Sequence, residues 1–437
     1  MDREQGDWPS KGVAWYAVAA LMLASVMSLV DRQVLNLLVD PIRASLGLSD
    51  LQIGMLQGPA FMVCYTLLGF PAGWWADRAH RLRLIAAGMV LWSIATMACG
   101  LVDSYGAMLA ARAAVGIGEA VLAPATISLM ADYFAPEKRA IAMSVQGTAT
   151  NAGIGISLLV GGAVMAAARG MQPIVIEGLP PIDGWRFVFL ACGLPGIVVA
   201  LLVLAAREPP RRSNRSASAP AIAFVAFVRD SRRWILGHFT AISIVAVLSY
   251  SVMAWGPSYL IRRYGWSIGE AGLALGLMFA VLGPLASLAG GFLARAYQMR
   301  GESDGALRVL RIGTAGLATC MVALALPWSS RLVVVPLAAA VFFLTMMPIV
   351  SAVAVQEVSP NAVRGRVAAT YYIVTNLIGA GLGPLVTASL TQYVFREPSQ
   401  IGLSFATIAA IGGPIVLVLL TLTLAPYRML VAARATE

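Results

Sequence analysis

The sequence predicts an all-α membrane protein with twelve transmembrane helices, arranged as two pseudo-symmetric bundles of six. Three observations predict this fold. Hydrophobic residues make up 59% of the 437 residues and charged residues only 12%, against about 45–50% and about 25% in ordinary globular domains. Twelve apolar segments recur along the chain, and short loop motifs between the segments of the first half recur at corresponding places in the second half. This composition excludes a soluble globule, a disordered chain and a small disulfide-stapled domain.

The twelve apolar segments are each long enough to cross a bilayer, which takes about 20 residues. Between the sixth and seventh lies a polar stretch that is rich in arginine, serine and proline. We therefore expect an N-terminal bundle over 1–206, a linker over 207–233 and a C-terminal bundle over 234–437. A short apolar run at 219–228 predicts an interfacial helix in the linker. The expected spans are 13–40, 51–72, 84–102, 106–131, 140–167, 186–206, 234–260, 271–294, 310–327, 332–355, 366–393 and 402–425.

The two halves repeat each other at corresponding loops. The sequence from Gly73 to Arg78 after the second span has its counterpart from Gly291 to Arg295 after the eighth. Likewise, a Pro136-centred segment before the fifth span corresponds to a Pro360-centred segment before the eleventh. Such duplication is typical of transporters built from repeated six-helix halves.

The distribution of basic residues predicts the orientation. With a cytoplasmic N-terminus, 22 of the 31 Lys and Arg residues fall in cytoplasmic loops and 7 in outer loops. Cytoplasmic loops of membrane proteins carry such an excess, so we expect a multi-pass protein of the cell (inner) membrane with both termini cytoplasmic. The same distribution explains the net charge of +10 without a nucleic-acid partner.

Four ionisable side chains lie inside predicted spans: Asp31, Arg32, Arg112 and Glu119. Each costs roughly 2.5–3.5 kcal/mol at the bilayer centre, so such residues pair or line a cavity and are functional candidates. Arg112, Gly116 and Glu119 share one helix face, whereas adjacent Asp31 and Arg32 diverge by about 100°. We expect Glu119 to carry a coupling proton, with Asp31 assisting, and Arg32 or Arg112 to hold a substrate anion. A purely structural ion-pair cluster is the alternative.

On its motifs, the sequence resembles the major facilitator superfamily over almost its whole length. The residues that carry the resemblance are Gly73, Asp77, Arg78, Arg81 and Arg83 in the loop after the second span, the Arg112-x-x-x-Gly116-x-Gly118 run, and Gly184-Trp185-Arg186-Phe187. His80 stands where the family usually has glycine, and Leu82 also departs from the pattern. The chain resembles the spinster branch most, through Asp31-Arg32, Gly116 to Ala120, and Pro124.

The resemblance implies a proton-linked carrier that works by alternating access and is commonly a monomer. Animal spinster proteins are tied to lysophospholipids and sphingosine phosphate, so we expect a lysophospholipid or a similar anionic or zwitterionic amphiphile. The alternative is a proton-coupled carrier of small carboxylic acids, and a more distant one is a transporter-like receptor without turnover. The expected partners are therefore a small-molecule or lipid substrate, protons and membrane lipids.

Two further groups of residues complete the expected machinery. A gating motif of Gly73, Asp77, Arg78, Arg81 and Arg139 would latch the cytoplasmic side, the alternative being a solvated loop that only sets topology; Gly73 is expected to permit close helix packing. The candidate cavity residues are Gln146, Thr150, Tyr372 and Asn376.

An enzymatic role is not expected. The sequence has no HExxH, GxSxG or Walker motif, and its two histidines, His80 and His238, are far from the carboxylates along the chain. These are the local patterns that zinc, serine-nucleophile and nucleotide chemistry require. We therefore expect no catalytic residue, no metal site and no cofactor.

Overall fold

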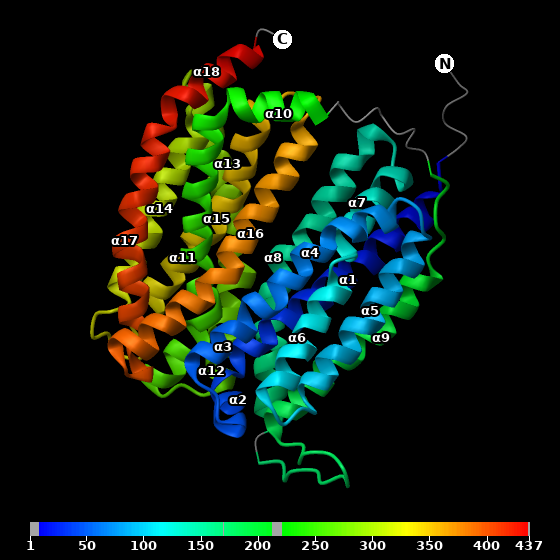
Figure 1. Cartoon of the computed structure of the whole chain (residues 1–437), viewed down its shortest axis with the longest axis vertical. Coiled ribbons are helices and arrows are strands. Elements are labelled where there is room, and N and C mark those ends of the chain that lie inside the picture. Colours follow the sequence, from blue (N-terminus) through cyan, green and yellow to red (C-terminus); the bar gives the residue numbers. More distant parts are fainter. Residues whose placement is uncertain (1–7, 169, 212–220, 436–437) are drawn as a thin grey trace. The chain divides into compact units, whose positions relative to one another are not determined.

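The computed structural model describes residues 8–168, 170–211 and 221–435. Within these ranges the secondary structure is helical, apart from one isolated antiparallel bridge between Ile174 and Ile182. Twelve helical segments are long and apolar enough to cross a membrane. The predicted fold class and number of spans are therefore confirmed (Figure 1).

Each predicted span corresponds to one helix or to two or three consecutive helical segments. The helices are α1 (Lys11–Leu37), α2 (Val39–Leu46), α3 (Asp50–Gln57), α4 (Pro59–Ala76), α5 (Arg81–Cys99), α6 (Tyr105–Glu119), α7 (Leu122–Tyr133), α8 (Pro136–Ala167), α9 (Gly184–Ala205), α10 (Ala221–Asp230), α11 (Arg232–Tyr264), α12 (Ile268–Leu277), η1 (Met278–Leu282), α13 (Gly283–Met299), α14 (Gly305–Ala323), α15 (Val334–Val358), α16 (Arg364–Ser389), η2 (Leu390–Phe395), η3 (Pro398–Gln400), α17 (Ile401–Leu422) and α18 (Leu424–Ala435).

The chain divides into two compact units. The first comprises residues 1–214 together with 267–280, and the second comprises 215–266 and 281–437. In the first unit α1 packs on α8 and α9, α5 on α6 and α9, and α12 on α8. In the second unit α11 packs on α16 and α17, and α14 on α15 and α17. The bundle boundaries drawn from the sequence stay a prediction.

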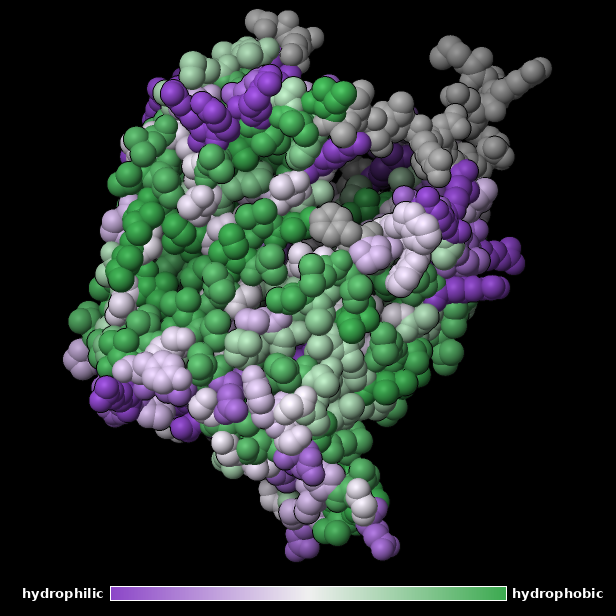
Figure 2. Space-filling model, in the orientation of Figure 1, coloured by the Kyte–Doolittle hydropathy of each residue, from purple (hydrophilic) through white to green (hydrophobic). Residues whose placement is uncertain are grey.

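Apolar side chains cover both the interior and the outer faces of the helices. Within the second unit, Leu285, Phe292, Val418 and Leu422 are more than half exposed, while Trp234, Trp255 and Phe405 are fully buried. Figure 2 shows hydrophobic residues along the sides of this unit and hydrophilic residues gathered at its two ends. A soluble protein rarely exposes apolar patches of this extent, and a lipid environment explains them.

Three of the expected continuous spans are broken, and two of the breaks are followed by a proline. The first span ends at Leu37 and continues as α2. The second breaks at Gly58, directly before Pro59, whose missing N–H ends the α3 hydrogen-bond pattern. The fourth breaks at Ala120 and Val121, four and three residues before Pro124. The carboxylate of Glu119 therefore stands at the last residue of a half-helix.

Glycines bring α6 against two neighbouring helices. A Cβ at Gly116 would lie 2.5 Å from the carbonyl oxygen of Phe61 on α4, and one at Gly118 would lie 2.8 Å from the backbone of α5. The space beside Gly116, on the α6 face that it shares with Arg112 and Glu119, is thus filled by α4. Gly73 differs from the expectation, because a Cβ there would find nothing within 4 Å. Close helix packing is not the reason for that glycine.

The packing of α6 gives a direct prediction for stability. Gly116→Ala should destabilise the protein by about 1–3 kcal/mol, since the added methyl group must push α4 away. Thermal unfolding in detergent measures the change. Gly106→Ala is the matched control on the same helix, where the new Cβ finds open space, and it should leave the melting temperature unchanged or slightly raised. Equal effects of the two substitutions would contradict the packing argument.

Candidate functional site

A buried ion pair joins α1 to α6. The Arg32 guanidinium lies 2.6 Å (Nη2) and 2.7 Å (Nε) from Glu119 Oε2. The Ser28 hydroxyl, one helical turn before Arg32, donates to the same oxygen at 2.6 Å. Glu119 has a fully buried side chain, and its other oxygen, Oε1, has no hydrogen-bond partner among the described residues. One carboxylate oxygen is therefore held by three donors, and the other is free to take a proton.

Two aromatic rings of α4 contact the Arg32 guanidinium. Its Cζ atom lies 4.6 Å from the ring centre of Phe61 and 4.7 Å from that of Tyr65, and the two rings are themselves stacked. A cation over aromatic faces is stabilised electrostatically, more strongly where water is excluded. The Arg32 side chain keeps 27% of its surface exposed, whereas the Glu119 side chain has none. Arg32 is thus the member of the pair that a ligand can reach.

Arg112 is buried but does not hold a carboxylate. Its guanidinium donates to the backbone oxygen of Asp31 at 3.1 Å and to that of Leu56 at 3.4 Å. Leu56 lies in the last turn of α3, where carbonyl groups lack helical partners, so the break before Pro59 supplies an acceptor. The arginine that shares a helix face with Glu119 is therefore not its partner; Glu119 pairs with Arg32 across the bundle.

Asp31 lies in the core of the first unit with 1% of its surface exposed. Its Oδ1 atom has no hydrogen-bond partner among the described residues. Trp92 and Thr96 on α5 are the polar side chains within interaction range, and Arg112 and Glu119 are the nearest charges. Asp31 and Arg32 point to different neighbours, as expected for adjacent residues of a helix.

Together these residues form a charge cluster whose net charge depends on one proton. With both carboxylates ionised, the two arginines balance Asp31 and Glu119. A proton on Glu119 would leave Arg32 without its counter-ion, still charged, still held over two aromatic rings and partly exposed. The arrangement can therefore bind a proton and an anion in the same state.

A second charged network fixes the loop between α4 and α5. Arg81 has no exposed surface and forms an ion pair with Asp132 of α7. It also contacts Glu208 at 2.9 Å, Ser128 Oγ at 3.0 Å and the Pro209 carbonyl at 3.2 Å. One arginine of the predicted gating motif thus ties α5, α7 and the chain after α9 together.

The linker glutamate also caps a helix. Glu208 accepts hydrogen bonds from the backbone N–H groups of Arg81 and Leu82, the first two residues of α5, where a negative charge is favourable. His80 Nδ1 lies 2.5 Å from Glu208 Oε2. Burial raises the pKa of Glu208, but the hydrogen bonds and charge of Arg81 and the two N–H groups outweigh burial, so the pKa lies below its ordinary value.

This lowered pKa predicts how stability depends on pH. The folded protein binds the Glu208 proton less tightly than the unfolded chain does. Ionised Glu208 therefore stabilises the fold at pH values above its ordinary pKa of 4.5, and this stabilisation is lost as the pH falls below 4.5 and through the lowered pKa of the folded state. As the pH falls through this range, the melting temperature should decrease less steeply for Glu208→Gln than for the wild type. Glu137→Gln, at an exposed glutamate of the same unit, should keep the wild-type slope.

The remaining members of the gating motif lie nearer the surface. Arg78 stacks on the Trp74 ring at 4.1 Å, and Arg139 donates to the Ala131 carbonyl at 2.7 Å. The Asp77 side chain is exposed and has no ion-pair partner among the described residues, while its backbone carbonyl accepts a hydrogen bond from Arg211. Arg211 donates also to the carbonyls of Ala76 and Ala79. A latching role for Asp77 and Arg78 stays a prediction.

The candidate cavity residues fall in different surroundings. Gln146 donates to Ser25 Oγ at 2.8 Å and to the Leu21 carbonyl, tying α8 to α1. The Thr150 side chain lies outside the part of the chain that is described. In the second unit, Asn376 accepts a hydrogen bond from the Tyr250 hydroxyl at 3.1 Å, and Tyr372 is half exposed. Their role in a cavity stays a prediction.

Several residues of the site were not expected from the sequence. Ser28 is four residues before Arg32, and Phe61 and Tyr65 are likewise four apart, so each pair shares a helix face. That spacing was the available signal. Glu208 was marked by being an isolated acidic residue within a basic linker. Asp132 had no comparable signal, since it pairs with Arg81 through the fold.

One family model and several known transporters match this chain. The sequence model of the Major Facilitator Superfamily matches residues 21–384. The chain is 30% identical over 297 residues to an MFS-type efflux pump of Mycolicibacterium smegmatis, covering 67% of this chain and 65% of that protein. It is 25% identical over 338 residues to a probable galactarate/D-glucarate transporter of Bacillus subtilis, covering 70% of both.

Spinster proteins are also among the relatives. The chain is 25% identical over 254 residues to protein spinster homolog 1 of Xenopus laevis, covering 56% of this chain and 45% of that protein. The crystal structure of a bacterial homolog of the human lysosomal transporter Spinster, inward-facing and unoccupied, superposes with a TM-score of 0.79 at 24% identity. It covers 97% of this chain and 98% of that one. The expected resemblance is confirmed, although the match spans less than two thirds of the mycobacterial and Xenopus relatives.

Proposed function

Since this chain belongs to the major facilitator superfamily of transporters, we propose that it is a proton-coupled secondary carrier of an anionic or zwitterionic amphiphile, of the lysophospholipid class. The observation that carries the proposal is the Arg32–Glu119 pair, in which a fully buried carboxylate forms an ion pair with a partly exposed arginine. Burying such a pair costs desolvation free energy, and ionisable residues inside membrane segments are functional candidates for that reason.

The geometry supports a coupling step that uses this pair. A proton enters Glu119 at Oε1, which has no partner among the described residues. The neutral acid holds Arg32 less strongly, and the guanidinium turns to the anionic group of the substrate, since charge-assisted pairs with phosphate or carboxylate are the stronger ones. Asp31 stays close by and limits the positive charge of the cluster. Proton and anion are then bound together and released together.

The amphiphile is favoured over a compact anion by the surroundings of Arg32. Phe61 and Tyr65 place apolar ring surface directly beside its guanidinium, which suits a charged head group that is attached to an apolar chain. The resemblance to the spinster branch, whose animal members are tied to lysophospholipids, favours the same class. Small carboxylic acids are the second candidate, favoured by the sugar-acid transporter among the relatives.

Flux into proteoliposomes distinguishes the candidates. Labelled lysophosphatidylglycerol and labelled glucarate are offered separately, with and without an imposed proton gradient, and protein-free liposomes give the background. Uptake of the lipid that increases with the gradient supports the proposal. Gradient-dependent uptake of glucarate alone would favour the second candidate. Saturable binding of the lipid without any flux would indicate a receptor and contradict the carrier mechanism.

The proposal includes a membrane orientation and a gate. Both termini are placed on the cytoplasmic side of the cell membrane, a single copy is the working unit, and Asp77, Arg78 and Arg139 take part in latching that side. Single cysteines introduced at Arg83 and Arg396, both exposed in the structure, should label with a membrane-impermeant maleimide in intact cells only at Arg396. Labelling at Arg83 alone would reverse the orientation.

A further inference from the structure

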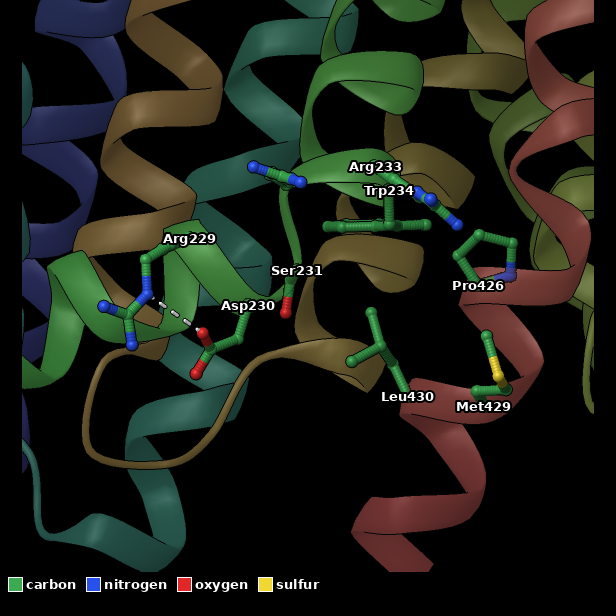
Figure 3. A pocket seen from close by; sticks show the side chains of 9 residues that line it. Arg229, Asp230, Ser231, Arg233, Trp234, Pro426, Met429 and Leu430 are labelled. Carbon is green, nitrogen blue, oxygen red and sulfur yellow. Dashed lines mark hydrogen bonds and ion pairs between the residues drawn. The ribbon is translucent and has the colours of Figure 1, made fainter.

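The second unit carries a cavity that the coupling mechanism does not use. It lies where α10 meets the start of α11, against α18, and has a volume of about 510 Å³. Arg229, Arg232 and Arg233 line it together with a single acidic residue, Asp230. Figure 3 shows Arg229 and Asp230 on one side, Pro426 and Met429 on the other, and Arg233 beside the Trp234 ring near Pro426. Basic and apolar side chains therefore line the cavity together.

Two of these arginines have no partner among the residues of this unit that the structure describes. Arg229 forms an exposed ion pair with Asp230 at 3.2 Å, and that pair uses up the one acidic group of the cavity. Among the described residues, neither Arg232 nor Arg233 has a hydrogen bond or an ion pair. Guanidinium groups prefer planar, bidentate pairing with phosphate or carboxylate. A cavity with two such groups unpaired has the charge to hold one anion.

An apolar groove continues from the basic cavity. It has a volume of about 490 Å³ and is lined by Gly237, Leu419 and Leu422, and it shares Arg233, Pro426 and Met429 with the first cavity. Leu422 is 68% exposed. Gly237 lies in the α11 membrane span, and Leu419 and Leu422 lie in the last turn of the α17 span. The groove therefore opens toward the hydrocarbon region, and the arginines stand at its polar boundary.

We propose that the cavity and groove together bind one anionic phospholipid of the surrounding membrane, with its phosphate on Arg233, which lines both, with Arg232 adding positive charge at the cavity, and with an acyl chain along α11 and α17. Charge complementarity selects the head group, and a groove at the level of the membrane spans is reached by a lipid tail. The site lies wholly in the second unit, on residues separate from the Arg32–Glu119 cluster. A bound lipid would contact α10, α11 and α18 at once and stabilise their packing. The stability of this unit would then depend on the content of anionic lipid in the membrane.

Binding is measured by native mass spectrometry on the full-length protein released from detergent. The probes are dioleoyl-phosphatidylglycerol, dioleoyl-phosphatidylcholine and inorganic phosphate. Phosphatidylglycerol should bind more tightly than phosphatidylcholine. The double variant Arg232→Gln/Arg233→Gln should weaken its binding about 30-fold, the value expected if each arginine near an anionic head group contributes about 1 kcal/mol. Ala425→Trp, which places bulk at an exposed position of the groove, should weaken binding of both lipids.

The matched control is Arg295→Gln/Arg300→Gln, which removes the same charge from two exposed arginines of the same unit outside the cavity. It should leave the preference for phosphatidylglycerol unchanged, and melting temperatures report whether each variant folds. An equal loss in the control would overturn the proposal in favour of diffuse charge attraction. Competition by inorganic phosphate with no effect of Ala425→Trp would overturn it in favour of a free-anion site. Failure of the proposed transport function would not affect either result.

Discussion

Replacing Glu119 with glutamine is expected to abolish the stimulation of transport by a proton gradient. The amide cannot exchange a proton, but it is nearly isosteric and still offers an oxygen to Ser28 and Arg32, which contact Glu119 in the wild type. Gradient-driven uptake should fall to the rate measured without a gradient. Exchange of labelled for unlabelled substrate, which needs no net proton movement, should persist.

Two measurements make this result specific. The melting temperature of Glu119→Gln should fall less than that of a variant with a fully buried uncompensated charge, because the amide keeps a hydrogen-bonding oxygen and the charge left behind, Arg32, is 27% exposed. Glu137→Gln removes an exposed carboxylate of the same unit and should leave coupling intact. A folded Glu119→Gln protein that still responds fully to the gradient would place the coupling proton elsewhere, with Asp31 next to be tested.

Replacing Arg81 with leucine is expected to produce a large loss of stability. The side chain is fully buried and bonded to Asp132, Glu208, Ser128 and the Pro209 carbonyl. Removing one partner of a buried ion pair leaves the opposite charge uncompensated and costs about 3–5 kcal/mol. The measurement is the melting temperature and the yield of folded protein after extraction.

Neighbouring arginines provide the control for this effect. Arg83→Leu removes an exposed charge from the start of the same helix and should change stability by no more than about 0.5 kcal/mol. Arg81→Lys restores the charge without the forked geometry, so it should recover only part of the loss. Equal behaviour of Arg81→Leu and Arg83→Leu would contradict the buried network.

The number and positions of the membrane spans could be predicted because apolar length alone decides them. The breaks within spans could not be placed in the same way. Gly58-Pro59 and Pro124 are visible in the sequence, but proline inside a membrane helix either kinks it or interrupts it, depending on which neighbours accept the freed groups. Arg112, which donates to the Leu56 carbonyl, is such a neighbour, and it comes from another helix.

The site residues could be predicted as a set but not as pairs. The cost of burying charge singles out Asp31, Arg32, Arg112 and Glu119 regardless of fold. Partner choice depends on how α1 and α6 approach each other, which the shared face of Arg112 and Glu119 on α6 does not reveal. The structure pairs Glu119 with Arg32. Gly73 was assigned to helix packing from its motif, whereas its surroundings are open.

The burial of Arg81 means that one residue serves two stages in the life of the protein. Basic residues orient a nascent chain while it is still unfolded and entering the bilayer. At that stage Arg81 is one charge among many on its side. Once folded, it has no exposed surface and belongs to the interior of the first unit. A neighbouring arginine can therefore replace Arg81 in orienting the chain during insertion. No neighbour can replace it in the buried network, so chains with a substitution at Arg81 should insert in the correct orientation but fail to fold.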